Sequence, residues 1–252
     1  MYQYIYDAFL SEGKYAKILS MIENRLTDLG IGGRVSRLNL FKDPRELIYE
    51  GLKIGVQTVV AVGNDATLTQ VINAVSDLKL TIGMIPVGPK NEIAEVLGIS
   101  EGLSACDCLS NRLIQRIDLG KINDYYFLSH LRASSKIHLR NGGQYCIRSI
   151  KDNCVEIYNL PTLNERANPQ DGYLEVKIKP TLGRLGGVRS LGIFNKQSGA
   201  DRASFFPFKK IFLESGDAAP VLVDNLKVVN TPAEVQILPQ RLRMIVGKNR
   251  LF

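Results

Sequence analysis

The chain has 252 residues, of which 45% are hydrophobic and 23% are charged, as in an ordinary globular protein. These values exclude general disorder, a collagen-like rod and a coiled coil, and no apolar run reaches the roughly 18 residues of a membrane span. Four cysteines are too few for a disulfide framework, and the first residues show no signal peptide. We therefore expect a cytoplasmic protein that meets a membrane, if at all, peripherally at its inner surface.

The net charge of +7 lies entirely in the second half of the chain. Residues 1–120 hold 12 basic and 14 acidic side chains, whereas residues 121–252 hold 20 and 11. A basic half favours phosphates or anionic lipid headgroups, and a solvated surface without a ligand is the alternative. The chain has no tryptophan and no nucleic-acid-binding motif, so a nucleic-acid partner is not expected.

The first half alternates predicted strands with predicted helices, which we assign from apolar runs and from helical spacing of apolar residues. The strands are expected at residues 2–6, 35–40, 58–62 and 80–85, and the helices at 18–29, 44–55, 67–75 and 91–97. Continuous apolar strands are typical of buried parallel sheets. This order predicts an α/β Rossmann-like N-terminal domain with a mainly parallel sheet.

After about residue 120 the helical spacing disappears and short extended segments follow. They are expected at residues 125–131, 137–140, 145–150, 155–160, 174–178, 209–213, 221–223, 235–238 and 242–246. Gly142-Gly143 is predicted to form a hairpin turn between two of them. The spacing predicts an all-β, sandwich-like C-terminal domain. We place the domains at 1–122 and 123–252, and we leave room for the last residues to return to the first domain.

The strongest local motif is VGNDATL at residues 62–68, where a buried strand enters a small-residue turn and then a helix. Such turns lie at the carboxyl ends of parallel strands, where open α/β sheets bind ligands, and the free N–H groups of a helix start favour phosphate. Asp65 is a candidate to hold a metal ion or to accept a hydroxyl proton, and Thr67 to cap the helix or touch a phosphate. A capped turn without a ligand is the alternative.

A second segment, IPVGPKNEIA at residues 85–94, repeats this geometry. Asn91 is a favourable N-cap residue. Lys90 is expected on the rim of the turn, in reach of a phosphate, although an isolated lysine is more often only solvated.

Together these segments resemble the catalytic domain of diacylglycerol kinases, which is shared with sphingosine kinases and bacterial lipid kinases. AVGNDATLTQVINAV resembles the family block GGDGTLNEVINGL, and GMIPVGPKNEIAEVLGI is similar to GIIPLGTGNDFARSLGI. RIDLG with YFL, NPQDGYLEV, and PVLVD with TPAEV resemble three further blocks and follow in the family's order. The resemblance covers residues from about 55 to 246.

The resemblance implies a nucleotide cleft between the two domains, with ATP and Mg²⁺ as the phosphoryl donor and a lipid hydroxyl as the acceptor. It makes Asp65 and Asp224 the candidate catalytic residues, the second because it matches the aspartate of the family's DGE motif. The candidate nucleotide-binding residues on the two loops are Gly63, Asn64, Thr67, Gly88, Lys90 and Asn91.

Several positions depart from the family pattern. Asn64 and Ala66 replace two glycines, and a Cβ there could block close approach of the backbone to phosphate. Pro89 removes a backbone N–H, DGE has become DNL at residues 224–226, and the early NPxSG loop is replaced by YDAF at residues 6–9. Lys90 is hypothesised to compensate by adding a positive charge.

Three functions are consistent with these observations. The first is a divergent lipid kinase that phosphorylates a diacylglycerol-like hydroxyl, with a nucleotide and a lipid or an anionic membrane surface as partners. The second is a nucleotide- or lipid-binding relative without catalysis, which the altered motifs favour. The third is an NAD kinase-like enzyme, since NAD kinases share a GGDGT-type loop. A homo-oligomer is left open.

Other residues are not assigned to chemistry. The four cysteines and the two histidines, His130 and His138, lack the spacing of metal ligands, so no metal site of their own is predicted. The aromatic residues 205–208 are expected in the core, with a loop that dips into a membrane as the alternative.

Overall fold

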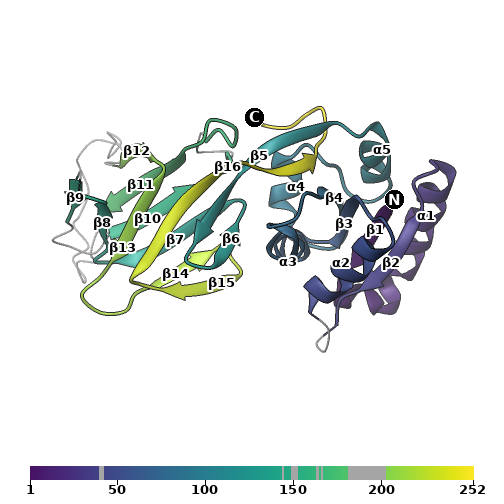
Figure 1. The fold of residues 1–252 in the computed structure, drawn as a ribbon, viewed down its shortest axis with the longest axis horizontal. Coiled ribbons are helices and arrows are strands. Elements are labelled where there is room, and N and C mark those ends of the chain that lie inside the picture. The colour runs from purple at the N-terminus through teal and green to yellow at the C-terminus, as the bar shows by residue number, and fades with distance from the viewer. Residues whose placement is uncertain (40–42, 144, 149–152, 163–164, 166, 181–202) are drawn as a thin grey trace, which may run out of the picture.

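The computed structural model of the chain describes residues 1–39, 43–143, 145–148, 153–162, 165, 167–180 and 203–252. Figure 1 shows an α/β domain at one end and a β domain at the other, joined by two long strands. Each domain has its own hydrophobic core. The predicted fold class is therefore confirmed. Within the described ranges, no helix is both long and apolar enough to cross a membrane.

The N-terminal domain is built on a parallel sheet with the strand order β2-β1-β3-β4. The strands are β1 (Tyr2–Tyr6), β2 (Gly33–Arg37), β3 (Thr58–Gly63) and β4 (Thr81–Pro86). The helical segments are η1 (Ala8–Ser11), η2 (Gly13–Tyr15), α1 (Ala16–Asp28), α2 (Pro44–Lys53), α3 (Asp65–Val75), α4 (Glu92–Val96) and α5 (Leu103–Asn111). Helices α2 and α3 pack together on one face of the sheet, and α1 and α5 on the other (Figure 1). All residues of β3 and β4 are buried, as their continuous apolar character predicts.

The C-terminal domain packs two sheets against each other, the 10-stranded sheet I, which also contains the parallel strands, and the 6-stranded sheet II. Sheet II is antiparallel with the order β12-β11-β10-β7-β14-β15. Its strands are β7 (His130–Ser135), β10 (Asn153–Tyr158), β11 (Leu174–Pro180), β12 (Ser204–Phe208), β14 (Pro220–Val223) and β15 (Lys227–Asn230). Sheet I continues from the N-terminal domain through β5 (Ile114–Ile122), β6 (Tyr125–Phe127), β8 (His138–Asn141), β9 (Tyr145–Ile147), β13 (Lys210–Glu214) and β16 (Ala233–Ile245). Apolar side chains of both sheets form the second core, which makes this domain a sandwich.

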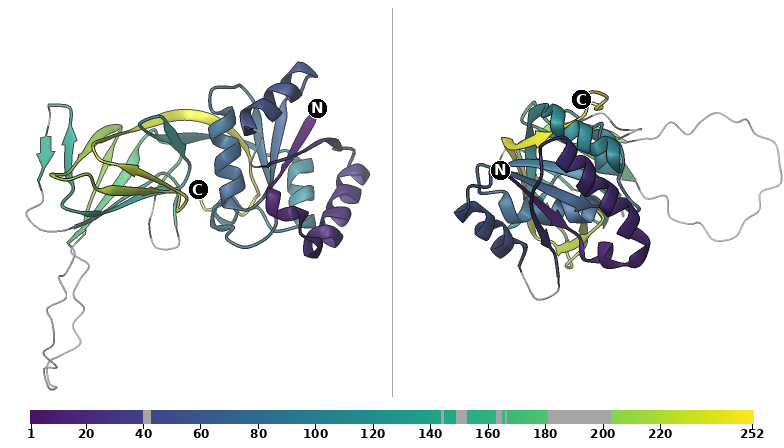
Figure 2. Two further views of the ribbon diagram at one scale, coloured as in Figure 1. Left: turned by 90° about the horizontal axis from the view of Figure 1, so that it is seen from below. Right: turned by 90° about the vertical axis from the view of Figure 1, so that its right-hand side faces the viewer.

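Strand β16 belongs to both domains. It pairs antiparallel with β5 over most of its length, and near its end Arg243 and Met244 pair in parallel with Thr81 and Ile82 of β4. The left view in Figure 2 shows this strand running from the β domain to the edge of the parallel sheet. The boundary placed after residue 122 stays a prediction.

Some predicted elements differ from the observed ones. The strand expected at 35–40 is β2, which starts at Gly33, where the backbone approaches Tyr2 too closely for a Cβ. The segment 125–131 is two strands, β6 and β7, because the chain turns at Leu128 and Ser129. The segments 235–238 and 242–246 are one strand, β16, with a register shift between Leu238 and Leu242.

Other elements were not predicted: η1, η2, α5, β5, β12 and β15. The aromatic residues Phe205, Phe206 and Phe208 lie in β12. Phe208 is buried as expected, but the expected core position is wrong for Phe205, which is 57% exposed. The Gly142-Gly143 turn between β8 and β9 is as predicted.

Candidate functional site

The two loops singled out in the sequence lie side by side at the carboxyl edge of the parallel sheet. The N–H of Val87 donates to the carbonyl of Gly63 at 2.8 Å, and the N–H of Asp65 donates to the carbonyl of Lys90 at 3.2 Å. The fold thus brings the candidate residues of both loops together.

The first loop caps its own helix. Asn64 is the N-cap of α3, and its side-chain oxygen accepts the N–H groups of Ala66 at 3.0 Å and Thr67 at 3.3 Å. In return, the N–H of Asn64 donates to the hydroxyl of Thr67 at 3.1 Å. Together with the Asp65–Lys90 bond, this gives each N–H from Asn64 to Thr67 a partner within the chain.

Asp7, at the end of β1, completes this arrangement. Its carboxylate accepts the hydroxyl of Thr67 at 2.7 Å and the N–H of Phe9 at 3.2 Å. Gly63 has a φ of +153°, and a Cβ there would collide with the Thr67 hydroxyl and lie 3.1 Å from the Cβ of Asp7. In the sequence, residues 6–9 stand out only because they differ from the NPxSG loop of the family. That β1 ends at the same edge as β3 is the signal that could have placed Asp7 here.

The second loop is covered by the same segment. A Cβ on Gly88 would lie 3.0 Å from the ring of Phe9, whose edge packs against Tyr15 with ring centroids 5.4 Å apart. Lys90 is exposed with a left-handed φ of +69°, which favours the glycine that the family has at this position. Its contact with phosphate stays a prediction.

Asn91 occupies the N-cap position of α4 without capping it through its side chain. Its amide nitrogen donates to the carbonyl of Gly88 at 2.7 Å and to Glu101 at 2.8 Å. Within the described part of the chain, its buried side-chain oxygen has no hydrogen-bond partner.

Asp65 caps α4 instead. Both of its carboxylate oxygens accept the N–H of Ile93, at 3.1 and 3.2 Å. Burial raises the pKa of Asp65 from 3.8 to about 6, although the backbone N–H groups of Ile93 and Glu92 oppose this shift. The carboxylate therefore fixes the first turn of α4, which carries Glu92 and Glu95. Its catalytic role stays a prediction.

The raised pKa of Asp65 predicts a pH-dependent stability. The group stabilises the fold most below the unfolded pKa of 3.8, and this contribution is lost as the pH rises through about 6. Asp65→Asn keeps an acceptor for Ile93 without the charge. Between pH 4 and 7 the wild type should therefore lose on the order of 2 kcal/mol relative to this variant. Urea unfolding at several pH values checks this, and parallel stability curves for the two proteins would contradict it.

Asp224 lies in the left-handed turn between β14 and β15, with a φ of +46°. Its buried carboxylate accepts three backbone N–H groups, those of Leu128, Ser129 and His130, each at 2.9 Å. Burial raises the pKa of Asp224, and these three N–H groups act in the opposite direction. The carboxylate thus holds the turn between β6 and β7. Its catalytic role also stays a prediction.

A cavity of about 240 Å³ lies between the two domains. Its lining residues are Glu92, Glu95, Val96, Ser129, His130, Pro161, Thr162 and Leu251. One wall is the helix held by Asp65, and the opposite wall is the turn held by Asp224. A hollow of about 470 Å³ beside Gly88 is lined by the N-terminal domain alone. The first cavity is lined by residues of both domains and lies between the elements that Asp65 and Asp224 hold, so we take it as the candidate site.

His130 was not assigned to a site from the sequence, because a lone histidine in a strand is usually a packing residue. In the structure its ring nitrogen Nδ1 lies 3.0 Å from the hydroxyl of Ser129, and its ring packs against Tyr158. Its place two residues after the YFL segment is the signal that could have drawn attention to it.

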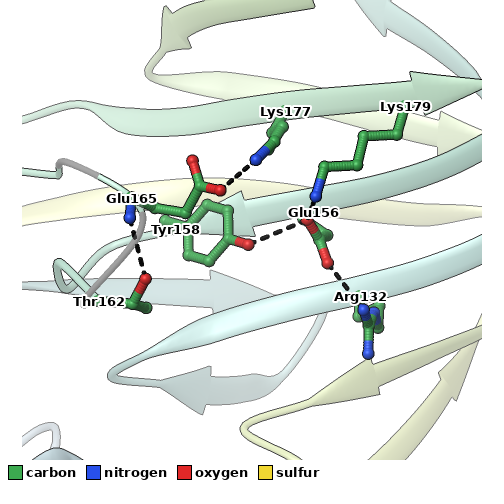
Figure 3. A network of polar contacts seen from close by, with 7 residues as sticks. All are labelled: Arg132, Glu156, Tyr158, Thr162, Glu165, Lys177 and Lys179. Atoms are coloured by element: carbon green, nitrogen blue, oxygen red, sulfur yellow. Dashed lines mark hydrogen bonds and ion pairs between the residues drawn. The ribbon is translucent and has the colours of Figure 1, made fainter. Parts of the chain in front are cut away.

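A polar network holds the loop that forms the remaining wall of the cavity, where Pro161 and Thr162 lie. Figure 3 shows its members on sheet II and the following loop: Arg132, Glu156, Tyr158, Thr162, Glu165, Lys177 and Lys179. Lys177 pairs with Glu165, whose N–H donates to the hydroxyl of Thr162 at 3.1 Å. Burial opposes ionisation of Glu156, but the Tyr158 hydroxyl and the neighbouring cations hold its pKa below the ordinary value. These contacts tie the loop that carries Pro161 and Thr162 to the sheet.

Comparisons with known proteins agree with this architecture. The diacylglycerol kinase catalytic domain matches residues 4–122. A diacylglycerol kinase of Bacillus subtilis is 37% identical over 75 residues, which are 28% of this chain and 25% of that protein. A diacylglycerol kinase of Staphylococcus saprophyticus is 31% identical over 81 residues, which are 31% of this chain and 27% of that protein. The chain thus aligns with about a quarter of each of these two relatives.

The likeness extends to both domains in a solved structure. A crystal structure of a diacylglycerol kinase from Bacillus anthracis superposes with a TM-score of 0.80, covering 99% of this chain and 98% of that one. The sequence identity is 17%, so this comparison concerns the fold alone.

Proposed function

Because residues 4–122 match the diacylglycerol kinase catalytic domain, we propose that this chain phosphorylates the hydroxyl of a diacylglycerol-like lipid in the cavity between its domains. The observation that carries the proposal is that Asp65 and Asp224 hold opposite walls of one cavity. In this proposal both are positioning residues. ATP with Mg²⁺ is the donor that the match to the kinase catalytic domain suggests.

The lining of the cavity suits a lipid hydroxyl. Glu92 and Glu95 on one wall and His130 on the other are groups that can exchange a proton with an alcohol. Val96, Pro161 and Leu251 supply apolar surface for the glycerol and the first acyl carbons. The basic second half of the chain would bring the protein to an anionic membrane surface.

The phosphates of a donor do not fit the start of α3 as it stands. Each N–H from Asn64 to Thr67 is already bonded within the chain, and the carboxylate of Asp7 lies beside them. The start of α3 therefore takes no part in the proposed reaction.

The proposal is tested with anionic vesicles that contain diacylglycerol, using radiolabelled ATP and Mg²⁺. We expect a labelled, phosphorylated lipid, and we expect Glu92→Gln to lower its rate at least tenfold by removing a proton-exchanging group. Glu46→Gln is the matched control, because it also removes one carboxylate from the first turn of a helix, and it should leave the rate unchanged. A wild-type protein that labels no lipid would refute the proposal.

A second candidate function is a lipid-binding relative without catalysis. The bonded N–H groups at the start of α3 favour it, because a loop that does not take phosphate does not present a donor. It predicts that the wild type sediments with the same vesicles but labels no lipid. The relatives reported above are diacylglycerol kinases, and no observation on the described residues favours an NAD kinase-like enzyme.

A further inference from the structure

The start of α3 lies where phosphate sites are found in such sheets, but its N–H groups are already bonded within the chain. It follows a buried parallel strand, and in such a helix the first N–H groups ordinarily have no partner within the helix. Here the side-chain oxygen of Asn64 takes the N–H groups of Ala66 and Thr67, and the carbonyl of Lys90 takes that of Asp65. A phosphate at this place would first have to break these bonds.

Asp7 also places a negative charge where a phosphate would lie. Its carboxylate is bonded to the Thr67 hydroxyl at 2.7 Å, at the positive end of the dipole of α3. A carboxylate there gains the same electrostatic stabilisation that a phosphate would gain. A second anion at this position would be repelled by the first.

The same segment fills the space in front of both loops. The volume that a side chain on Gly63 would need is taken by Thr67 and Asp7, and the volume beside Gly88 is taken by the ring of Phe9. The missing side chains of these two glycines therefore make room for residues 7–9 of the chain itself.

We propose that Asp7 and Asn64 are specificity-determining residues that exclude phosphate from the start of α3. The side-chain oxygen of Asn64 accepts the N–H groups that would bind a phosphate. The carboxylate of Asp7 takes the place of the phosphate at the positive end of the helix dipole. The inference rests on the proposed function in one respect, since it takes ATP as the phosphate-bearing ligand of this loop.

The experiment is calorimetric titration of the full chain with ATP in the presence of Mg²⁺. Asn64→Gly frees the two N–H groups, and because glycine is itself an acceptable N-cap residue, the helix should remain folded. Asp7→Asn removes the charge but keeps an acceptor for Thr67 and Phe9. The double variant should bind ATP at least tenfold more tightly than the wild type. Asp43→Asn, an aspartate that caps α2, is the matched control for the charge and should not change the affinity.

The outcomes separate this inference from the proposed function. Tighter binding by the double variant supports the exclusion of phosphate whether or not any protein labels a lipid. Equal affinity of the wild type and the double variant overturns it, even if the wild type is an active kinase. Failure of both proteins to bind millimolar ATP also overturns it, because something other than Asp7 and Asn64 would then exclude the nucleotide.

Discussion

Asp224→Ala is expected to lower the free energy of unfolding by about 3–5 kcal/mol, because it removes a buried carboxylate that accepts three backbone N–H groups. These N–H groups belong to Leu128, Ser129 and His130, and each lies 2.9 Å from the carboxylate. The turn between β6 and β7 should loosen, and with it the wall of the cavity that carries His130. Asp224→Asn retains one acceptor oxygen and tolerates the left-handed backbone, so its loss should be smaller.

Urea unfolding followed by circular dichroism measures this effect, and tyrosine fluorescence gives a second signal, since the chain has ten tyrosines and no tryptophan. Asp217→Ala is the matched control, because Asp217 is an exposed aspartate in the turn before β14. It should change stability by less than about 0.5 kcal/mol. If Asp224→Ala were as stable as this control, the three hydrogen bonds would not hold the turn.

Asp118→Ala is expected to lower the free energy of unfolding by about 2–4 kcal/mol. Asp118 is fully buried in β5, and its two oxygens accept the N–H of Gly172 at 2.7 Å and that of Gln240 at 2.6 Å. These bonds join β5, the turn before β11 and the register shift of β16. Removing the carboxylate should therefore release three segments that are far apart in the chain.

The same unfolding measurement applies, with Asp124→Ala as the control. Asp124 lies six residues further along, and its side chain is fully exposed, with only a long contact of 3.9 Å to Lys121. An exposed ion pair of this kind contributes little, so the control should match the wild type. Equal stability of the two variants would show that the buried carboxylate does not join the segments.

The parts of the fold that sequence patterns predicted are those that local chemistry determines. Asp43 followed by Pro44 begins a helix as expected, and the buried runs of β3 and β4 are in the sequence as continuous apolar segments. The order of the two domains followed from the change in spacing after about residue 120. A single strand was expected at 125–131 because the turn at Leu128 and Ser129 has no local signal, and Asp224 fixes it from 96 and 95 residues away.

The candidate site was predicted less completely, because its contacts also join residues that are far apart in the chain. The two loops were located correctly, and Thr67 does take part in capping its helix. The contact between Asp7 and Thr67 joins residues 60 positions apart, and neither segment has a sequence pattern that predicts contact with the other. Asp65 was expected to face a ligand, yet its nearest partner is the N–H of Ile93 on the neighbouring loop. Spacing along the chain can suggest that a carboxylate is important, but its partner is known only from the folded structure.

The shared strand β16 also determines when the N-terminal domain can be completed during synthesis. Thr81 and Ile82 of β4 are made early, but their neighbours on that side, Arg243 and Met244, emerge only after nearly the whole β domain. Until then one edge of the parallel sheet presents unpaired backbone groups, which can pair with another chain. The two domains are thus not independent units strung together, because the nascent first domain acquires its last strand only from residues that follow most of the β domain in the chain.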